Sequence, residues 1–270
     1  MRTESDLLGE LQIPETAYYG VQTQRAINNF KISNNYLSHY PEFVKALGVV
    51  KLGAAQANHE LGILSKELFD AISFASNELI AGKYTEQFPI DMIQGGAGTS
   101  TNMNANEVIA NIALEHLGKQ KGEYQFCSPN DHVNLSQSTN DAYPSALKLA
   151  LFNMNKPLID ALTSLYEAFD KKGKQFGNVI KMGRTQLQDA VPMTLGQEFE
   201  GFSNTLHKEV DNLNRIAAEL LVINMGATAI GTGLNAVPGY AQLCTTKIAE
   251  IMNEDVSLAD NLVEATSDTS

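Results

Sequence analysis

Apolar residues recur at intervals of three and four along most of the chain, which is the period of an amphipathic α-helix. The first such run begins near Pro41, and Gly62 and Gly82 are plausible stop signals for two consecutive helices. The apolar faces of these two helices consist of Phe43, Leu47, Val50, Ala54, Ala57 and Leu61, then Leu68, Ile72, Ala75 and Leu79. A third helix is expected to begin near Thr101 and to end at Gly118.

Two longer apolar stripes follow in the second half of the chain. The first consists of Leu147, Leu151, Met154, Leu158, Leu162, Leu165 and Phe169, and it covers about 33 Å at a rise of about 1.5 Å per residue. The second consists of Leu195, Phe199, Phe202, Leu206, Val210, Leu213, Ala217 and Leu220. Helices of this length are typical of bundles, and Pro157 should kink the first one.

Two stripes do not close a bundle of long helices, and residues 259–270 have the pattern of another helix that has only begun. Either partner subunits complete the bundle or the chain is a fragment of a longer protein, and both can hold. The expected fold is therefore mainly α. It comprises a small N-terminal helical domain (residues 1–138) with short extended segments or a hairpin in residues 7–20, then an incomplete central long-helix bundle domain (residues 139–270).

Composition narrows the class of protein. The hydrophobic content of 43% is enough for a core, and the net charge of −12 disfavours nucleic acid and anionic membranes as partners. The chain shows neither a signal-peptide core nor an apolar run near the ~20 residues of a membrane span. Cys127 and Cys244 form no CxxC and fit reduced thiols, so we expect a cytoplasmic protein.

Two turns rich in hydroxyl groups, residues 94–100 and 136–141, lead directly into expected helix starts. Unpaired N–H groups and the helix dipole favour an anion there, and Ser or Thr side chains add small donors. Two such turns suggest a small dicarboxylate as ligand. Taken alone, however, each turn is better explained as an ordinary cap, with Thr99 or Ser100 capping one helix and Ser138 or Thr139 the other.

Other site chemistries find less support. The glycine-rich turn lacks the Lys of a nucleotide-binding loop, the five His residues show no HxxxH spacing, and no GxSxG or Cys nucleophile signature is present. We therefore predict no metal site. A carboxylate beside an acidic C–H bond would become an aci-carboxylate dianion on proton loss, and donors held at its oxygens would stabilise that state. The sequence offers no convincing general base for this step.

In combination, five segments resemble the aspartase/fumarase superfamily, and the resemblance covers essentially all 270 residues. The segments are residues 18–23, 95–107, 134–141, 183–192 and 226–235. Ser138-Thr139-Asn140 is similar to the bacterial aspartases, whereas class II fumarases usually have Ser-Ser-Asn. Gln186 follows Thr185 where fumarases have His, which favours the aspartases again.

The resemblance implies a homotetramer with a central bundle and active sites built from three subunits, converting L-aspartate to fumarate and ammonia. Thr99, Ser138 and Thr139 would hold the β-carboxylate, with the two turns supplied by different subunits. Asn140 and Gln186 would lie by the amino group, and Thr185 would hold the α-carboxylate. No cofactor is required, and activation by a divalent metal at an unknown site stays open.

Two parts of the family pattern are missing. The flexible loop Gly-Ser-Ser-x-Met-Pro-x-Lys-x-Asn, which supplies the serine base, is expected downstream of Ser270. Ser128 to Asp131 replaces a His-Pro-Asn-Asp stretch that forms an accessory anion site in fumarases. Two other functions remain open: fumarate hydratase, and a non-catalytic helical oligomer or dicarboxylate-binding module in which the turns are only caps.

Because the base is expected outside these residues, we predict that the 270-residue chain alone has no meaningful lyase activity. The chain is incubated with L-aspartate and the absorbance of fumarate is followed. Robust turnover would contradict this expectation.

Overall fold

The computed structural model describes residues 1–96 and 98–268. The chain divides into two compact units, one of Met1–Ala150 with Leu221–Ser270 and one of Leu151–Leu220. Helix α5 (Thr139–Gln175) begins in the first unit and ends in the second. Each unit is described by itself.

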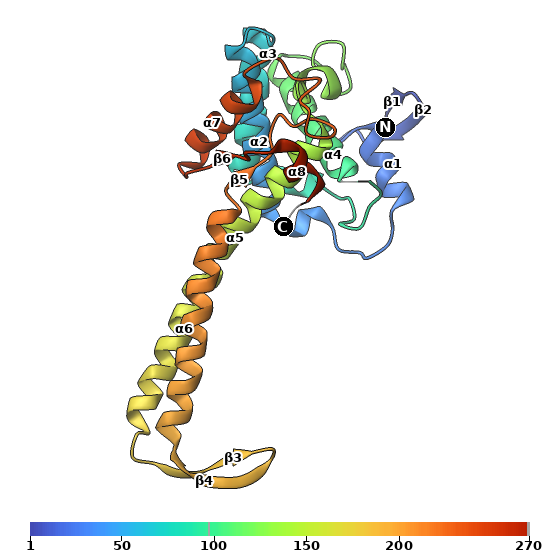
Figure 1. The fold of residues 1–270 in the computed structure, drawn as a ribbon. Helices are drawn as coiled ribbons and strands as arrows, with labels where there is room; N and C mark the ends of the chain where they lie inside the picture. Colours follow the sequence, from blue (N-terminus) through green and yellow to red (C-terminus); the bar gives the residue numbers. More distant parts are fainter. Residues whose placement is uncertain (97, 269–270) are drawn as a thin grey trace. The chain divides into compact units, whose positions relative to one another are not determined.

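The core of the first unit is built on α2 (Pro41–Glu60), which packs against α3 (Lys66–Ile80) and α7 (Tyr240–Met252). Helix α4 (Thr99–His116) packs against α3 and completes this group (Figure 1). Both α2 and α4 are buried on nearly every side. The close approach of α2 and α7 depends on Gly53, where a Cβ would lie 2.6 Å from Ile248 Cγ1.

Helix α4 has a polar side that is buried as fully as its apolar one. The buried polar residues on this helix are Thr101, Asn102, Asn104, Asn106, Glu107 and Asn111. Several of their partners lie in irregular segments, so the helix orders the loops around it. Glu107, for example, accepts hydrogen bonds from the N–H groups of Gly20, Gln22 and Thr23 at the start of α1 (Val21–Asn29).

The N-terminal hairpin consists of β1 (Arg2–Asp6) and β2 (Gly9–Ile13), which pair antiparallel. It begins earlier than the expected hairpin in residues 7–20, because Arg2 is anchored to the carbonyl groups of Pro14, Ala17 and Tyr19. The remaining short elements of this unit are η1 (Leu37–His39), η2 (Thr85–Gln87), the π-helical turn η3 (Pro129–Val133), β5 (Val222–Ile223), β6 (Ser257–Leu258) and α8 (Leu262–Ser267). Strands β5 and β6 are parallel.

The second unit contains the C-terminal part of α5 and helix α6 (Leu195–Glu219), joined by the hairpin of β3 (Ile180–Thr185) and β4 (Gln188–Thr194) (Figure 1). Phe169 of α5 contacts Phe199 and Phe202 of α6. The segment between the two long helices is thus an antiparallel hairpin. Its two turn residues have positive φ angles, 50° at Gln186 and 67° at Leu187, as two-residue hairpin loops require.

The predicted mainly α fold is confirmed, and the long stripes do form helices. Helix α4 begins at Thr99, two residues before the expected start, and α5 is helical through Pro157. The two compact units do not follow the expected division at residue 138, because α7 returns to pack on α2. The expected boundary at residue 138 separates the N-terminal domain from a bundle that other chains would complete. The contacts within one chain do not test it, and it stays a prediction. In the part of the chain that the structure describes, no helix combines the length and apolarity needed to cross a membrane.

Candidate active site

The two hydroxyl-rich turns are neighbours within one chain. Asn102 Nδ2, in the first turn of α4, donates a hydrogen bond to Thr139 Oγ1 at the start of α5, with an N–O distance of 3.3 Å. Gly98 faces the ring of Tyr143 so closely that a Cβ at this position would overlap the ring. The expectation that different subunits supply the two turns is therefore wrong, because the N-terminal ends of α4 and α5 meet inside the first unit.

The start of α4 is open to a ligand. The residue before the helix is Gly98, with a φ of 88°, and it has no side chain to cap the N–H groups. Thr99 is the first helical residue and is exposed, so neither Thr99 nor Ser100 occupies the capping position. Gln94 Oε1 accepts a hydrogen bond from the N–H of Thr101 at 3.0 Å. The N–H groups of the two residues before it are at a position that favours an anion. Ala97, within the same turn, lies outside the described residues.

The start of α5 is held by its own side chains. Ser138 Oγ accepts a hydrogen bond from the N–H of Asn140 at 3.2 Å, and the Ser138 N–H donates to Asp141 Oδ1 at 2.9 Å. Ser138 therefore does act partly as a cap. Because its oxygen is an acceptor in that bond, its hydroxyl proton is available to donate to a ligand.

The loop between β5 and α7 closes the site from a third side. Asn140 Nδ2 donates to the carbonyl oxygen of Ala229 at 2.7 Å, and the N–H of Thr228 donates to Asp141 Oδ2 at 2.9 Å. Asn224 Nδ2 donates to the backbone oxygen of Asn140 at 3.1 Å. These bonds fix the orientation of the Asn140 amide, with its nitrogen toward Ala229 and its Oδ1 on the opposite side.

A buried ammonium group lies beneath the turns. Lys51 of α2 is 0% exposed, and its Nζ donates to Asn102 Oδ1 at 2.7 Å, Gln137 Oε1 at 2.8 Å and Asn134 Oδ1 at 3.2 Å. Burial lowers the pKa of Lys51 to about 7, and the negative charge of Asp141 opposes this shift. Burial also raises the pKa of Asp141 to about 6, against the hydrogen bonds from backbone N–H groups.

The sequence analysis missed Lys51, although a signal was present. Lys51 is the only charged residue in positions 46–58, an otherwise mainly apolar stretch of its helix where a solvated lysine would be out of place. A lysine in such a stretch is buried only when it has partners. The partners themselves are 51 or more residues away along the chain, so the sequence alone did not identify them.

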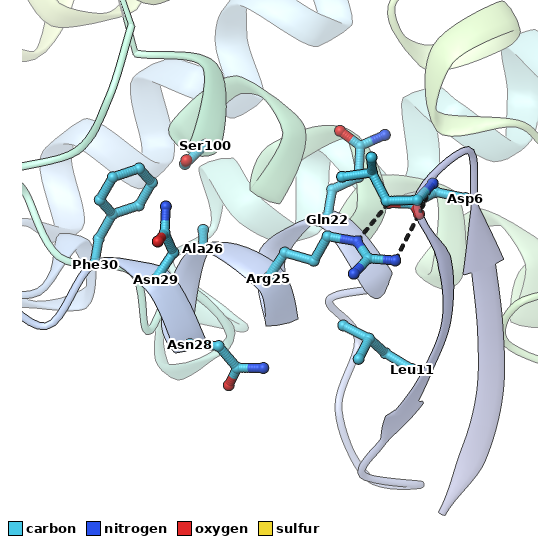
Figure 2. A pocket seen from close by; sticks show the side chains of 10 residues that line it. Asp6, Leu11, Gln22, Arg25, Ala26, Asn28, Asn29, Phe30 and Ser100 are labelled. Atoms are coloured by element: carbon cyan, nitrogen blue, oxygen red, sulfur yellow. Dashed lines mark hydrogen bonds and ion pairs between the residues drawn. The ribbon is translucent and has the colours of Figure 1, made fainter.

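A mainly apolar cavity of about 720 Å³ lies beside Asn140 in the first unit. Its lining includes Asn140, Tyr143, Leu147, Ile230, Val263 and Thr266. A second hollow, of about 470 Å³, lies beside Ser100 and is shown in Figure 2. Its arginine, Arg25, is bound to both carboxylate oxygens of Asp6, at 2.8 and 2.7 Å, and is thus already neutralised.

Two predicted site residues, Thr185 and Gln186, lie in the second unit. They are exposed at the end of the β3–β4 hairpin, and their role beside the substrate stays a prediction. At the suggested accessory position, Ser128 is engaged in capping η3. Its hydroxyl donates to Asp131 Oδ2 at 2.8 Å and accepts from the Asp131 N–H at 3.1 Å.

Comparisons with known proteins identify the family. A family model described as "Lyase" matches residues 9–270, and an aspartate ammonia-lyase from Pseudomonas aeruginosa is 58% identical over 268 residues. The chain belongs to the aspartase/fumarase family of lyases. The match covers 99% of this chain but 56% of that relative, so the chain spans little more than half the length of the curated lyase.

Solved structures of this lyase family have the same fold. A fumarate lyase:delta crystallin from Brucella melitensis, in a structure bound to cobalt, is 51% identical with a TM-score of 0.95, covering 98% of this chain and 58% of that one. A class II fumarase from Schistosoma mansoni is 34% identical with a TM-score of 0.88, again covering 98% and 58%. The chain is thus more similar to the aspartase than to the fumarase.

The contact between Gly98 and Tyr143 yields a stability prediction. Gly98→Ala should lower the free energy of unfolding by about 2 kcal/mol more than Gly62→Ala. Both glycines have positive φ angles, but no atom lies within 4 Å of a Cβ built at Gly62. Urea denaturation of the two variants measures the difference. Equal losses would show that only backbone strain matters and that the turns are not held by this contact.

Proposed function

We propose that the protein to which this chain belongs is an aspartate ammonia-lyase, which eliminates ammonia from L-aspartate to give fumarate. The observation that carries this proposal is the meeting of two helix N-termini, with the hydroxyl groups of Thr99, Ser138 and Thr139, at one place in the first unit. The 58% identity to a curated aspartate ammonia-lyase supports the same reaction. The whole protein's activity is proposed, since the chain spans 56% of that relative.

The β-carboxylate of L-aspartate would bind between the two helix starts. A base removes a proton from Cβ, and the electron pair moves onto the carboxylate to give an aci-carboxylate dianion. Its collapse forms the C–C double bond and expels the amino group, which leaves as ammonia after protonation. Fixed hydroxyl and N–H donors stabilise the dianion more than the carboxylate, which lowers the barrier. The base itself is the serine expected outside this chain.

Asn140 supports an amine as the leaving group. Because its Nδ2 is engaged by the carbonyl of Ala229, the free end of the amide is the acceptor Oδ1. An ammonium group has only donors, so an acceptor fixed in this way suits it. We propose that Gln186 contributes from the β3–β4 hairpin and that Thr185 of the same hairpin binds the α-carboxylate.

We further propose a homotetramer with composite active sites. Support comes from apolar side chains on α5 and α6 that are 40 to 50% exposed, namely Leu151, Met154, Leu158, Leu165, Phe202 and Ile216. Such faces are typical of helices that pack in a larger bundle. No cofactor is needed for this elimination, and activation by a divalent metal remains a separate possibility to test. The buried, unpaired thiols of Cys127 and Cys244 fit the proposed cytoplasmic location.

Fumarate hydratase uses the same dianion chemistry with water in place of ammonia, so substrate preference must be measured. The full-length protein is assayed for fumarate formation from L-aspartate and from L-malate. We expect kcat/KM for L-aspartate to be higher by about 10²-fold or more, since a site that pairs a substrate's donors rejects analogues lacking them. Equal or reversed values would favour the hydratase.

Alanine variants distinguish the lyase from a non-catalytic module in which the turns are only caps. In the full-length protein, Thr99→Ala and Ser138→Ala should each lower kcat/KM for L-aspartate by about 10²-fold, as expected for lost transition-state donors. Ser65→Ala is the matched control, because Ser65 caps α3 through the N–H of Leu68. It should cost about 1 kcal/mol of stability and leave kcat/KM unchanged. If Thr99→Ala, Ser138→Ala and Ser65→Ala all lower stability and all leave kcat/KM unchanged, the turns act only as caps.

A further inference from the structure

Asn102 joins the buried ammonium of Lys51 to the hydroxyl of Thr139. It projects from the first turn of α4 and is 1% exposed. Its Oδ1 accepts from Lys51 Nζ at 2.7 Å, and its Nδ2 donates to Asn134 Oδ1 at 3.0 Å and to Thr139 Oγ1 at 3.3 Å. The side chain thus lies directly behind one of the proposed carboxylate ligands.

The chemistry of Lys51 decides which way the Asn102 amide points. Three amide oxygens surround Lys51 Nζ, which matches the three donors of its protonated form, so the amide oxygen of Asn102 faces it. The amide nitrogen then faces Thr139. The opposite orientation would place N–H groups against the ammonium and leave the oxygen of Asn102 against the oxygen of Asn134.

Neighbouring amides agree with this direction. Gln137 directs Oε1 to Lys51, while its Nε2 donates to the carbonyl oxygens of Val133 and Leu135 at 2.9 and 3.2 Å. Asn134 Nδ2 donates to the backbone oxygen of Gln137 at 3.3 Å. The amide nitrogens of Asn102, Asn134 and Gln137 are each bound to a carbonyl or hydroxyl oxygen. Their amide oxygens therefore face the ammonium group of Lys51.

The direction of the Asn102 amide sets the direction of the Thr139 hydroxyl. A hydroxyl group has a single proton, and here its oxygen already accepts from Asn102. Among the described residues this proton has no protein acceptor, so it is free to point toward the helix starts. We propose that Asn102 is a positioning residue, oriented by Lys51, that makes Thr139 present its hydroxyl proton to the substrate carboxylate.

This inference rests on the proposed function and is tested by Asn102→Asp in the full-length protein. The variant keeps an acceptor for Lys51 but replaces the donor to Thr139 by an acceptor. The Thr139 proton should turn toward Asp at position 102, so the substrate carboxylate loses a charge-assisted hydrogen bond. We expect kcat/KM for L-aspartate and the affinity for fumarate to fall by at least about 10-fold each.

A double-mutant cycle separates this effect from general electrostatic repulsion. If Asn102 acts through the Thr139 hydroxyl, Asn102→Asp should change fumarate affinity by less than about 3-fold in the Thr139→Val background. Thr139→Ser keeps the hydroxyl and should restore the full sensitivity. An equal loss from Asn102→Asp with and without the hydroxyl would overturn the proposal.

Asn106→Asp is the matched control for a new buried carboxylate. Asn106 lies one turn further along α4, is 0% exposed, and also donates to Asn134 Oδ1, at 3.1 Å. Its Nδ2 otherwise contacts the Met103 sulfur and makes no bond to Thr139. Fumarate affinity should stay within about 3-fold of wild type. A loss as large as that of Asn102→Asp would overturn the proposal.

Folding and function are kept separate in this experiment. Urea denaturation establishes that each variant is folded, and Asn102→Ala, which removes the donor without adding charge, is used if Asn102→Asp does not fold. If the wild-type protein binds fumarate but does not deaminate L-aspartate, the proposed function is contradicted. The role of Asn102 can still be tested, because the double-mutant cycle is measured through fumarate affinity. A wild-type protein with no fumarate affinity would overturn both.

Discussion

The burial of the Lys51 ammonium is the interaction on which the candidate site depends. Removing a charge from water costs several kcal/mol unless its donors are satisfied, and here three amide oxygens satisfy them. Two of these oxygens belong to residues 134–137, and the third belongs to α4. The ammonium group therefore holds residues 134–137 against α4, because it needs amide oxygens from both. The starts of α4 and α5 are placed beside each other as a consequence.

The same principle operates along the rest of α4. Asn111 donates to the carbonyl of Tyr18 and to the Tyr124 hydroxyl, and it accepts from the N–H of Gly122. Glu107 anchors the start of α1 in a similar way. A buried polar group left unpaired would cost about 1 to 3 kcal/mol, so Glu107 and Asn111 each favour one loop conformation. The amide oxygens of Asn104 and Asn106 have no partner among the described residues and add nothing to this selection. A helix with a polar buried side can thus order segments that have no secondary structure of their own.

The apolar period predicted the helices well because burial on one face is a local property of the sequence. Pro41, Gly62 and Gly82 marked ends that the structure has within two residues. The β3–β4 hairpin was not predicted, since its turn residues are Gln186 and Leu187 rather than the Asn or Gly that usually signal positive φ. Lys51 was missed because its burial depends on partners distant in sequence. The helix-start pattern identified the hydroxyl-rich turns. The resemblance then assigned the two turns to different subunits, which the contact between Asn102 and Thr139 corrected.

The 270 residues of this chain carry a net charge of −12, which opposes the approach of an anionic ligand. Surface charges beyond about 8 to 10 Å are largely screened at physiological ionic strength, so short-range donors decide the outcome. At the helix starts those donors are hydroxyl and N–H groups, and the ammonium of Lys51 lies behind them. Asp141, equally buried, offsets part of that positive charge. The proposed carboxylate would therefore be bound mainly through oriented hydrogen bonds, and Lys51 would contribute more by fixing their direction than by its charge.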